Sequence, residues 1–260
     1  MVRLAHITDL HIRHHQPGTA TRTERRSRHI LTVLERLTPA LKNHGADVLV
    51  VTGDLLDVPD EVLAGDAAYE PDVNWPEVVD ADYRLFRGWL QSTGIPWVVI
   101  PGNHDDEAAF DRLFPDYADI TDIAGLRFVC FRDQLDETRQ PRRTAESRAL
   151  FEAVTQDAAH DTPQVHVQHF TIDPPTFHDG WQYEYSDAPA LKDMIETSGR
   201  VRAVLSGHFH PGYPVIFDNG VAYAPTPAFC ETPYPYRLVD IELRENGGAG
   251  VTADDHTLGE

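Results

Sequence analysis

The sequence lacks any run of the roughly 20 apolar residues that a transmembrane helix needs. Its first dozen residues, MVRLAHITDLHI, contain an aspartate and two histidines, which interrupt the apolar segment that a secretory signal peptide requires. Only two cysteines are present, Cys130 and Cys230, and both lie in apolar or aromatic surroundings where a buried, reduced thiol is the rule. We therefore expect a cytoplasmic protein with no disulfide framework and no membrane partner.

Positive charge is also scarce. The chain has 22 Lys and Arg residues against 42 Asp and Glu residues, a formal net charge of −20, and only two of its cations are lysines. Such a charge repels polyanions at long range, so we expect no nucleic acid polymer as a partner. The remaining composition, with 41% hydrophobic and 25% charged residues in a chain of 260, is typical of a folded globular protein.

Apolar runs that end in polar turns recur through the first half of the chain. The runs at 3–11, 47–57 and 95–107 indicate strands, and apolar residues at helical spacing predict helices over 23–45 and around 82–93. Thr23 is a candidate N-cap for the first helix and Gly45 a candidate stop. Residues 57–82 hold nine acidic side chains and no basic ones, which indicates a surface segment. The alternation of strand and helix favours parallel βαβ units.

The second half of the chain is richer in strand patterns. Strands are expected at 127–131, 164–170, 202–208 and 236–244, with a helix over 143–158 between the first two, and the Asn219-Gly220 pair predicts a β-hairpin within 213–227. No linker divides the chain, so residues 1–244 are predicted to form one domain. Residues 245–260 have little to bury and are expected to form a flexible tail.

Polar residues of one chemical kind follow five of the predicted strands. They are Asp9, His11, Asp54, Asn103, His104, Asp105, His169, His208 and His210. Sites in α/β sheets form outside the carboxyl ends of the strands, so these side chains are expected to converge. Oxygen and imidazole ligands without thiolate suit divalent Mn, Fe, Zn, Co or Ni, and the group is large enough for two ions. Taken singly, His11, His169, His208 or His210 is more often a surface or core imidazole than a ligand, and Asp105 is also consistent with a helix N-cap.

These residues lie in motifs that resemble a known family. The segments DLH, GDLLD, GNHD, VQHF and GHFH occur in the order and spacing of the calcineurin-like metallophosphoesterases, and the resemblance spans residues 3 to about 227. It implies an α/β fold of four layers, a two-sheet β-sandwich flanked by helices. It also implies two divalent metal ions, one bound by Asp9, His11, Asp54 and His210, and the other by Asp54, Asn103, His169 and His208. His104 would assist at the phosphoryl group, and Asp105 would orient His104.

Two divalent ions in such a site would attract a phosphate despite the net negative charge, and a hydroxide bridging them can attack phosphorus in line. The chain lacks the GDxxDRG and GNHE motifs of phosphoprotein phosphatases and is most similar to the small-molecule branch. We therefore expect a phosphodiesterase acting on a cyclic nucleotide or glycerophosphodiester. A phosphomonoesterase, such as a nucleotidase or sugar phosphatase, is the alternative. A metal-binding scaffold without turnover is a third hypothesis, which the presence of His104 disfavours.

Two further features stay open at this stage. The basic cluster Arg22, Arg25, Arg26 and Arg28 can hold a substrate phosphate, although a solvated helix face or an oligomer contact is the commoner role of such clusters. The segment HFTIDPP lacks the His-Pro that often follows the lone histidine of related enzymes, and the aromatic loop TFHDGWQYEYSD at 176–187 comes directly after it. This loop can stack a nucleobase, cover the site or form a homodimer contact. The histidines outside the ligand pattern are expected to be surface residues: His14, His15, His29, His44, His160 and His178.

Overall fold

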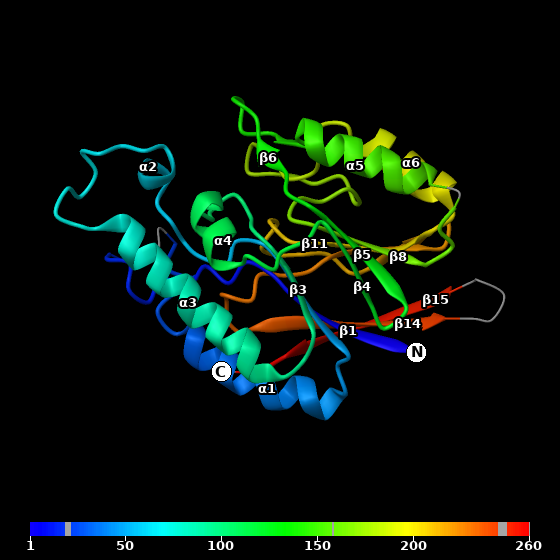
Figure 1. Cartoon of the computed structure of the whole chain (residues 1–260), viewed down its shortest axis with the longest axis horizontal. Helices are drawn as coiled ribbons and strands as arrows, with labels where there is room; N and C mark the ends of the chain where they lie inside the picture. Colours follow the sequence, from blue (N-terminus) through cyan, green and yellow to red (C-terminus); the bar gives the residue numbers. More distant parts are fainter. Residues whose placement is uncertain (19–21, 158, 244–248, 260) are drawn as a thin grey trace.

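Two large β-sheets pack face to face, with helices on both outer sides (Figure 1). A computed structural model describes residues 1–18, 22–157, 159–243 and 249–259. Among the described helices, none combines the length and the hydropathy that a membrane span needs. Cys130 and Cys230 are buried free thiols, as expected.

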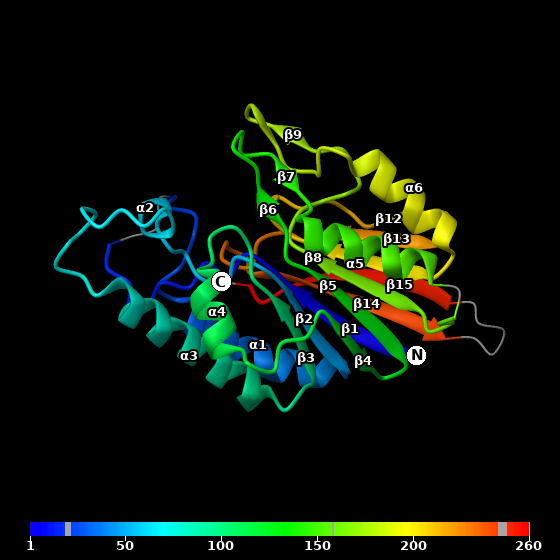
Figure 2. The same ribbon diagram turned by 45° about the horizontal axis from the view of Figure 1, so that its top comes forward.

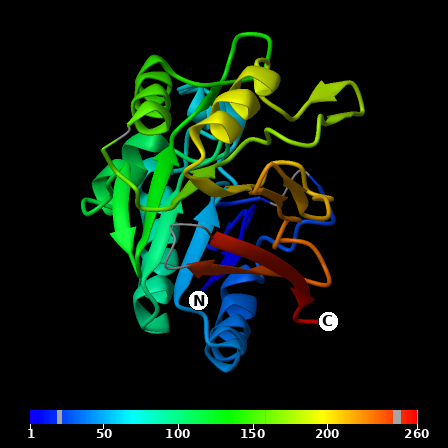
Figure 3. The same ribbon diagram turned by 90° about the vertical axis from the view of Figure 1, so that its right-hand side faces the viewer.

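The first sheet is mixed. Its strands are β1 (Val2–Ile7), β2 (Val48–Thr52), β3 (Trp97–Ile100), β14 (Pro235–Leu243) and β15 (Ala249–Thr257), in the order β15-β14-β1-β2-β3. β1, β2 and β3 run parallel, which confirms the predicted βαβ units. β14 pairs antiparallel with β1, and β15 antiparallel with β14, so β14 lies between the first strand and the red strand at the C-terminal end (Figure 3).

The second sheet contains six strands. They are β4 (Ile120–Ile123), β5 (Leu126–Phe131), β8 (Gln164–Gln168), β11 (Val201–Ser206), β12 (Ile216–Asp218) and β13 (Val221–Pro225), in the order β12-β13-β11-β8-β5-β4. Its four central strands, β5, β8, β11 and β13, run parallel to one another. Two short hairpins stand apart from the large sheets, one formed by β6 (Gln134–Leu135) and β7 (Pro141–Arg142), the other by β9 (Phe177–His178) and β10 (Trp181–Gln182).

Helices cover the outer face of each sheet (Figure 2). α1 (Ile30–His44), α3 (Trp75–Thr93) and α4 (Glu107–Leu113) lie on the first sheet, and α5 (Ala145–Gln156) and α6 (Ala188–Ser198) on the second. The short α2 (Asp60–Leu63) has no buried residue and lies in the segment before α3 (Figure 2). α1 buries the apolar stripe that its spacing predicts, Ile30, Val33, Leu34, Leu37 and Leu41, against the first sheet. α5 and α6 bury Phe151, Leu191 and Ile195 against the second sheet.

The space between the two sheets is filled by apolar side chains from both. Leu4, Val50 and Ile100 of the first sheet pack in one buried cluster with Phe128 and Leu205 of the second. A second cluster lies between the first sheet and its helices, and a third lies between the second sheet and its helices. The layers therefore follow in the order helix, sheet, sheet, helix, which confirms the predicted fold class.

The structure corrects the predicted tail. Residues 249–257 form β15, which pairs with β14 over nine residues from Pro235↔Thr257 to Leu243↔Ala249. Val251 and Ala253 pack against the cluster between the sheets, and Asp255 forms an ion pair with Arg237 at 2.6 Å. Backbone pairing at the free edge of β14 thus orders a segment with few large apolar side chains. Residues 245–248 and 260 of the expected tail lie outside the described residues.

Two helix boundaries also differ from the prediction. α1 begins at Ile30 after His29, and Thr23 does not cap it. The backbone N–H of Arg26 donates instead to Cys230 O at 2.8 Å, which holds the preceding segment against the C-terminal half of the chain. α3 begins at Trp75, inside the acidic segment, because Val79, Tyr83 and other residues at helical spacing extend its buried face. Gly45 ends α1 in the left-handed conformation with φ of 68°, as predicted.

Candidate metal centre

The polar residues that follow the strands meet at one edge of the sandwich. Asp9 and His11 follow β1, Asp54 follows β2, and Asn103 and His104 follow β3. From the second sheet come His169 after β8, and His208 and His210 after β11. Because the parallel strands of both sheets present their carboxyl ends on this edge, the structure brings all eight side chains together.

Four of these residues form a first donor set around His11 and His210. The two Nε2 atoms are 3.1 Å apart. His11 Nε2 lies 3.5 Å from Asp54 Oδ2 and 4.0 Å from Asp9 Oδ1, and His210 Nε2 lies 3.6 Å from the same Asp9 oxygen. All four side chains therefore direct a lone-pair atom at one small volume.

A second donor set shares Asp54 with the first. Its other oxygen, Oδ1, lies 3.4 Å from His169 Nε2, and Asn103 Oδ1 lies 3.2 Å from the same nitrogen. Ligand atoms of Asp54, His169 and His208 fall within 4.8 Å of one another. The two oxygens of Asp54 thus face different sets, the arrangement that a bridging carboxylate requires.

Hydrogen bonds and contacts at the second ring nitrogen orient three of the imidazoles. His169 Nδ1 donates to Thr52 O at 2.7 Å, and His210 Nδ1 donates to Glu231 Oε1 at 2.6 Å. His11 Nδ1 lies 3.3 Å from Asp57 Oδ1. Since each Nδ1 faces an acceptor, Nε2 is the nitrogen of each ring that points to the centre and can present a lone pair to a cation. Metal-binding histidines are oriented in this way.

A buried oxygen without a partner supports a cation at the first donor set. Asp9 is fully buried, and among the described residues its Oδ1 has no hydrogen-bond partner, although it faces two imidazole nitrogens. Burial raises the pKa of Asp9 and lowers the pKa of His11 well below its ordinary value, so each environment penalises the charged side chain. A divalent cation would satisfy these lone pairs, and the residues present fit such an ion.

In the second donor set, neighbouring charges outweigh burial and favour the charged side chains. Burial opposes a charge on His169, but the neighbouring Asp54 carboxylate outweighs it and raises the pKa of His169 to about 9. Burial likewise opposes ionisation of Asp54, yet His169 and His104 hold its pKa well below the ordinary value. A cation at this set would displace the proton of His169 and take its place beside the Asp54 carboxylate.

Backbone geometry at the centre is tight and unusual. Asp9, Asp54 and His208 adopt positive φ values of 53°, 49° and 67°, which non-glycine residues rarely do. A Cβ atom on Gly207 would lie 1.8 Å from Thr8 Oγ1, and one on Gly102 would lie 2.3 Å from Asp54 Oδ1. The glycines before His208 and Asn103 therefore let the two sheets approach closely enough to share ligands. Such local strain is typical of functional sites.

Asp105 has a different environment from the one predicted. The N-cap of α4 is Asp106, whose side chain accepts from the backbone N–H of Ala109. Asp105 is buried, and its carboxylate accepts from four groups: the N–H groups of Leu55, Leu56 and Gly102 and the hydroxyl of Tyr83. It thus ties the Asp54 loop to the loop that carries Asn103 and His104, instead of binding the His104 ring. Burial, together with Asp54, raises the pKa of Asp105 to about 7.

Two carboxylates beside the centre were missed in the sequence. Asp57 is buried 3.3 Å from His11 Nδ1 and accepts from Arg25 Nη1 at 2.9 Å. Asp57 is the second aspartate of GDLLD, which is a signal for the site, but it also begins the acidic segment at 57–82. Glu231 contacts His210 from the loop after β13, and no motif marks it.

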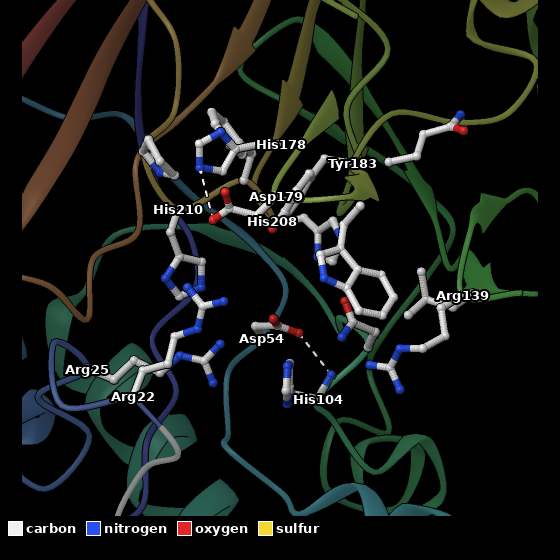
Figure 4. A pocket seen from close by; sticks show the side chains of 16 residues that line it. Arg22, Arg25, Asp54, His104, Arg139, His178, Asp179, Tyr183, His208 and His210 are labelled. Atoms are coloured by element: carbon white, nitrogen blue, oxygen red, sulfur yellow. Dashed lines mark hydrogen bonds and ion pairs between the residues drawn. The ribbon is translucent and has the colours of Figure 1, made fainter. Parts of the chain in front are cut away.

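A cavity of about 320 Å³ opens above the centre (Figure 4). Asp54, Asn103, His104, His208 and His210 line its floor. Arg22 and Arg25 lie on one side of Asp54 and His104, and Arg139 lies on the other. The basic cluster is therefore divided: the other two members, Arg26 and Arg28, are exposed and do not line this cavity.

The aromatic loop at 176–187 borders the same cavity. It folds into the β9–β10 hairpin, and His178, Trp181 and Tyr183 line the cavity wall. His178 is exposed, as expected, yet it belongs to this wall. The loop therefore covers part of the candidate site.

The family model for calcineurin-like phosphoesterases matches residues 2–212. The chain belongs to this family. The match covers all five motifs and both donor sets, so the phosphoesterase carries its family's signature at the edge described above. Members of the family are generally dimetal-dependent, and the chain has candidate metal-binding residues to match.

Solved structures confirm the fold. The phosphoesterase is similar to a dimetal phosphatase from Danio rerio, with a TM-score of 0.62, 13% identity, and coverage of 99% of this chain and 98% of that one. It is also similar to the calcineurin-like phosphoesterase YfkN from Bacillus subtilis, with a TM-score of 0.50, 13% identity, and coverage of 98% and 90%. GAP50 of Plasmodium, described as the anchor in the inner membrane complex, gives a TM-score of 0.54 at 13% identity and coverage of 99% and 88%. Among curated proteins no match was found.

Proposed function

We propose that this phosphoesterase hydrolyses a small phosphodiester, of the cyclic nucleotide or glycerophosphodiester type, with two divalent metal ions. The observation that carries the proposal is the pair of donor sets that share Asp54 beneath a cavity. Asp9, His11, Asp54 and His210 would hold one ion, and Asp54, Asn103, His169 and His208 the other. When bound, two such ions stabilise charge on the phosphoryl oxygens and lower the pKa of an attacking water.

His104 is the residue best placed to assist the leaving group. Its backbone N–H donates to Asp54 Oδ1 at 2.9 Å, which fixes it beside the shared carboxylate. Its ring lies 5.0 Å from the His11 ring, centroid to centroid, and lines the cavity. A half-buried imidazole in this position can donate a proton to the departing alkoxide. Asp105 supports this role indirectly, because it holds the His104 loop against the Asp54 loop.

The shape of the cavity supports a diester. The wall with Arg22 and Arg25 and the wall with Arg139 lie on opposite sides of Asp54 and His104 (Figure 4). A diester phosphate held above the donor sets would lie between these two walls, with one organic group directed toward each. Arginine on each side also offsets the net charge of −20 for an anionic substrate.

The test is hydrolysis of bis(p-nitrophenyl) phosphate against p-nitrophenyl phosphate, after loading with Mn, Fe, Co, Ni or Zn. We expect a higher kcat/KM for the diester. Asn103→Ala should lose activity together with one metal equivalent. His104→Gln should lower kcat by about 10²- to 10⁴-fold while two metal equivalents remain bound. No hydrolysis with any metal, or full activity in Asn103→Ala, would contradict the proposal.

A phosphomonoesterase is the second candidate, because Arg22 and Arg25 together can neutralise the extra charge of a terminal phosphate. The fold shared with the Danio rerio dimetal phosphatase supports the same alternative. Preference for p-nitrophenyl phosphate, with a large loss in Arg22→Ala for that substrate alone, would favour the monoesterase over the diesterase.

A further inference from the structure

We propose that the β9–β10 hairpin, with Tyr183 and Phe209, binds a planar aromatic ring of the substrate, of which a nucleobase is the commonest in phosphoesters. This inference rests on the proposed function, since it assigns a substrate class to the same cavity. Three observations carry it: a continuous row of aromatic rings from the donor sets to the cavity rim, an exposed tryptophan at that rim, and a hairpin fixed at its base.

The row of rings begins at the centre itself. The Tyr183 ring lies 5.2 Å from the ring of His208, a member of the second donor set, and 5.1 Å from the ring of Phe209. Phe209 stacks on Tyr213 at 5.0 Å with 19° between the planes. The His178 ring lies 5.8 Å from Phe209. The wall next to the centre is therefore aromatic, and Tyr183 is held in place by contacts on two sides.

Trp181 extends this wall at the rim. It lines the cavity yet is 50% exposed, unlike Trp75 and Trp89, which are buried. The Arg139 guanidinium carbon lies 5.8 Å from the centre of its ring, a distance at which cation–π attraction holds both side chains in place. A half-exposed tryptophan at a cavity rim leaves part of its apolar ring open to solvent, which marks a binding surface more than a folding requirement.

The hairpin is preorganised at both ends. Its two-residue turn, Asp179-Gly180, has φ values of 51° and 82°, as a type I′ turn requires. At its base, Tyr183 N donates to Thr176 O at 2.9 Å, and Thr176 N donates to Glu184 Oε2 at 2.8 Å. A wall that is already ordered loses little conformational entropy when a ligand stacks on it.

The hairpin also supplies a matched control. Phe177 lies on the same two-stranded unit and is 73% exposed, but it does not line the cavity. Phe177→Ala therefore removes an exposed aromatic ring from the hairpin without changing the proposed binding wall. Trp181→Phe retains a ring at the rim and tests whether aromatic character, rather than the indole itself, is needed.

The experiment compares two product-like ligands, AMP and ribose 5-phosphate, which differ only in the base. Their affinities for the metal-loaded protein are measured by calorimetry. Stacking of one base on aromatic side chains predicts that AMP binds about 5- to 150-fold more tightly than ribose 5-phosphate. Trp181→Ala should reduce that ratio at least threefold without changing the affinity for ribose 5-phosphate. Trp181→Phe should restore most of the ratio, and Phe177→Ala should leave it unchanged.

Two outcomes would overturn the inference. Equal affinity for both ligands, or the same ratio in Trp181→Ala and the parent protein, would refute a role of this wall in ring binding while leaving the proposed hydrolysis intact. Failure of both ligands to bind the metal-loaded protein would instead refute the phosphoester site as a whole, and the proposed function with it.

Discussion

Replacing Glu231 should weaken one metal equivalent and spare the other. Glu231 Oε1 accepts from His210 Nδ1 at 2.6 Å, and this hydrogen bond lowers the pKa of Glu231, which marks a charge-assisted contact. Its loss leaves the His210 ring free to rotate and removes the acceptor that selects its tautomer. Removing such a partner of a metal-binding histidine costs about 10- to 100-fold in metal affinity, or roughly 1.4–2.7 kcal/mol.

The second donor set should not respond to this change. His169, its oriented histidine, donates Nδ1 to the backbone oxygen of Thr52 at 2.7 Å, which no side-chain substitution removes. Glu231→Ala should therefore bind one metal equivalent normally and the other more weakly. Glu231→Gln keeps an acceptor oxygen and should lose less affinity at the weakened site. Glu35→Gln, on the exposed face of α1, makes the same charge change away from the centre and serves as the control.

Competition with a chromophoric chelator, using Mn or Zn, measures both equivalents in one titration. The reasoning is refuted if Glu231→Ala binds both ions as the parent does, or if it weakens both by the same factor. In the first case His210 needs no orienting partner. In the second, Glu231 supports the fold of the whole edge rather than one donor set.

Three further predictions concern stability. Gly207→Ala should destabilise the fold by about 3 kcal/mol or more, because the new Cβ would lie 1.8 Å from a hydroxyl oxygen. Gly88→Ala, within α3, should stabilise the fold by about 0.5–1 kcal/mol, because the new Cβ would have no atom within 4 Å. Urea unfolding measures both changes. Arg143→Met should cost about 3–5 kcal/mol in the same assay because it removes the cationic partner of the buried Asp133 carboxylate. Arg84→Met, at an exposed ion pair, should cost at most about 1 kcal/mol. The pKa of His169 is raised from 6.5 to about 9, so its protonated ring stabilises the metal-free folded protein. This stabilisation is complete below pH 6.5 and is lost as the pH rises through 9. The melting temperature should therefore fall across this pH range, and it should fall less in His169→Asn.

The sequence was most informative where a local pattern determines local geometry. The Asn219-Gly220 turn has φ values of 45° and 79° and joins β12 to β13 with Asp218 opposite Val221, as the dipeptide predicts. The convergence of Asp9, Asp54 and His169 likewise follows from one rule, that parallel strands present their carboxyl ends on the same edge. Each of these residues stands directly after an apolar run, so its position could be predicted without knowing which strands are neighbours.

Contacts between distant segments could not be predicted in this way. Glu231 reaches His210 across 21 residues, and Arg25 reaches Asp57 across 32. In each pair only one member, His210 or Asp57, lies in a motif. The strand at 249–257 is similar, since it is ordered by the open edge of β14 rather than by its own apolar residues. These interactions depend on which loops the two sheets bring together. The hydrophobic periodicity of a single segment does not indicate which distant segments become its neighbours.

The central claim is that the two donor sets sharing Asp54 hold two metal ions. Anomalous diffraction from crystals of the manganese-loaded protein tests it directly. We expect two anomalous peaks, one bounded by Asp9, His11 and His210 and the other by Asn103, His169 and His208, with Asp54 contacting both. A single peak, or peaks outside these residues, would contradict it.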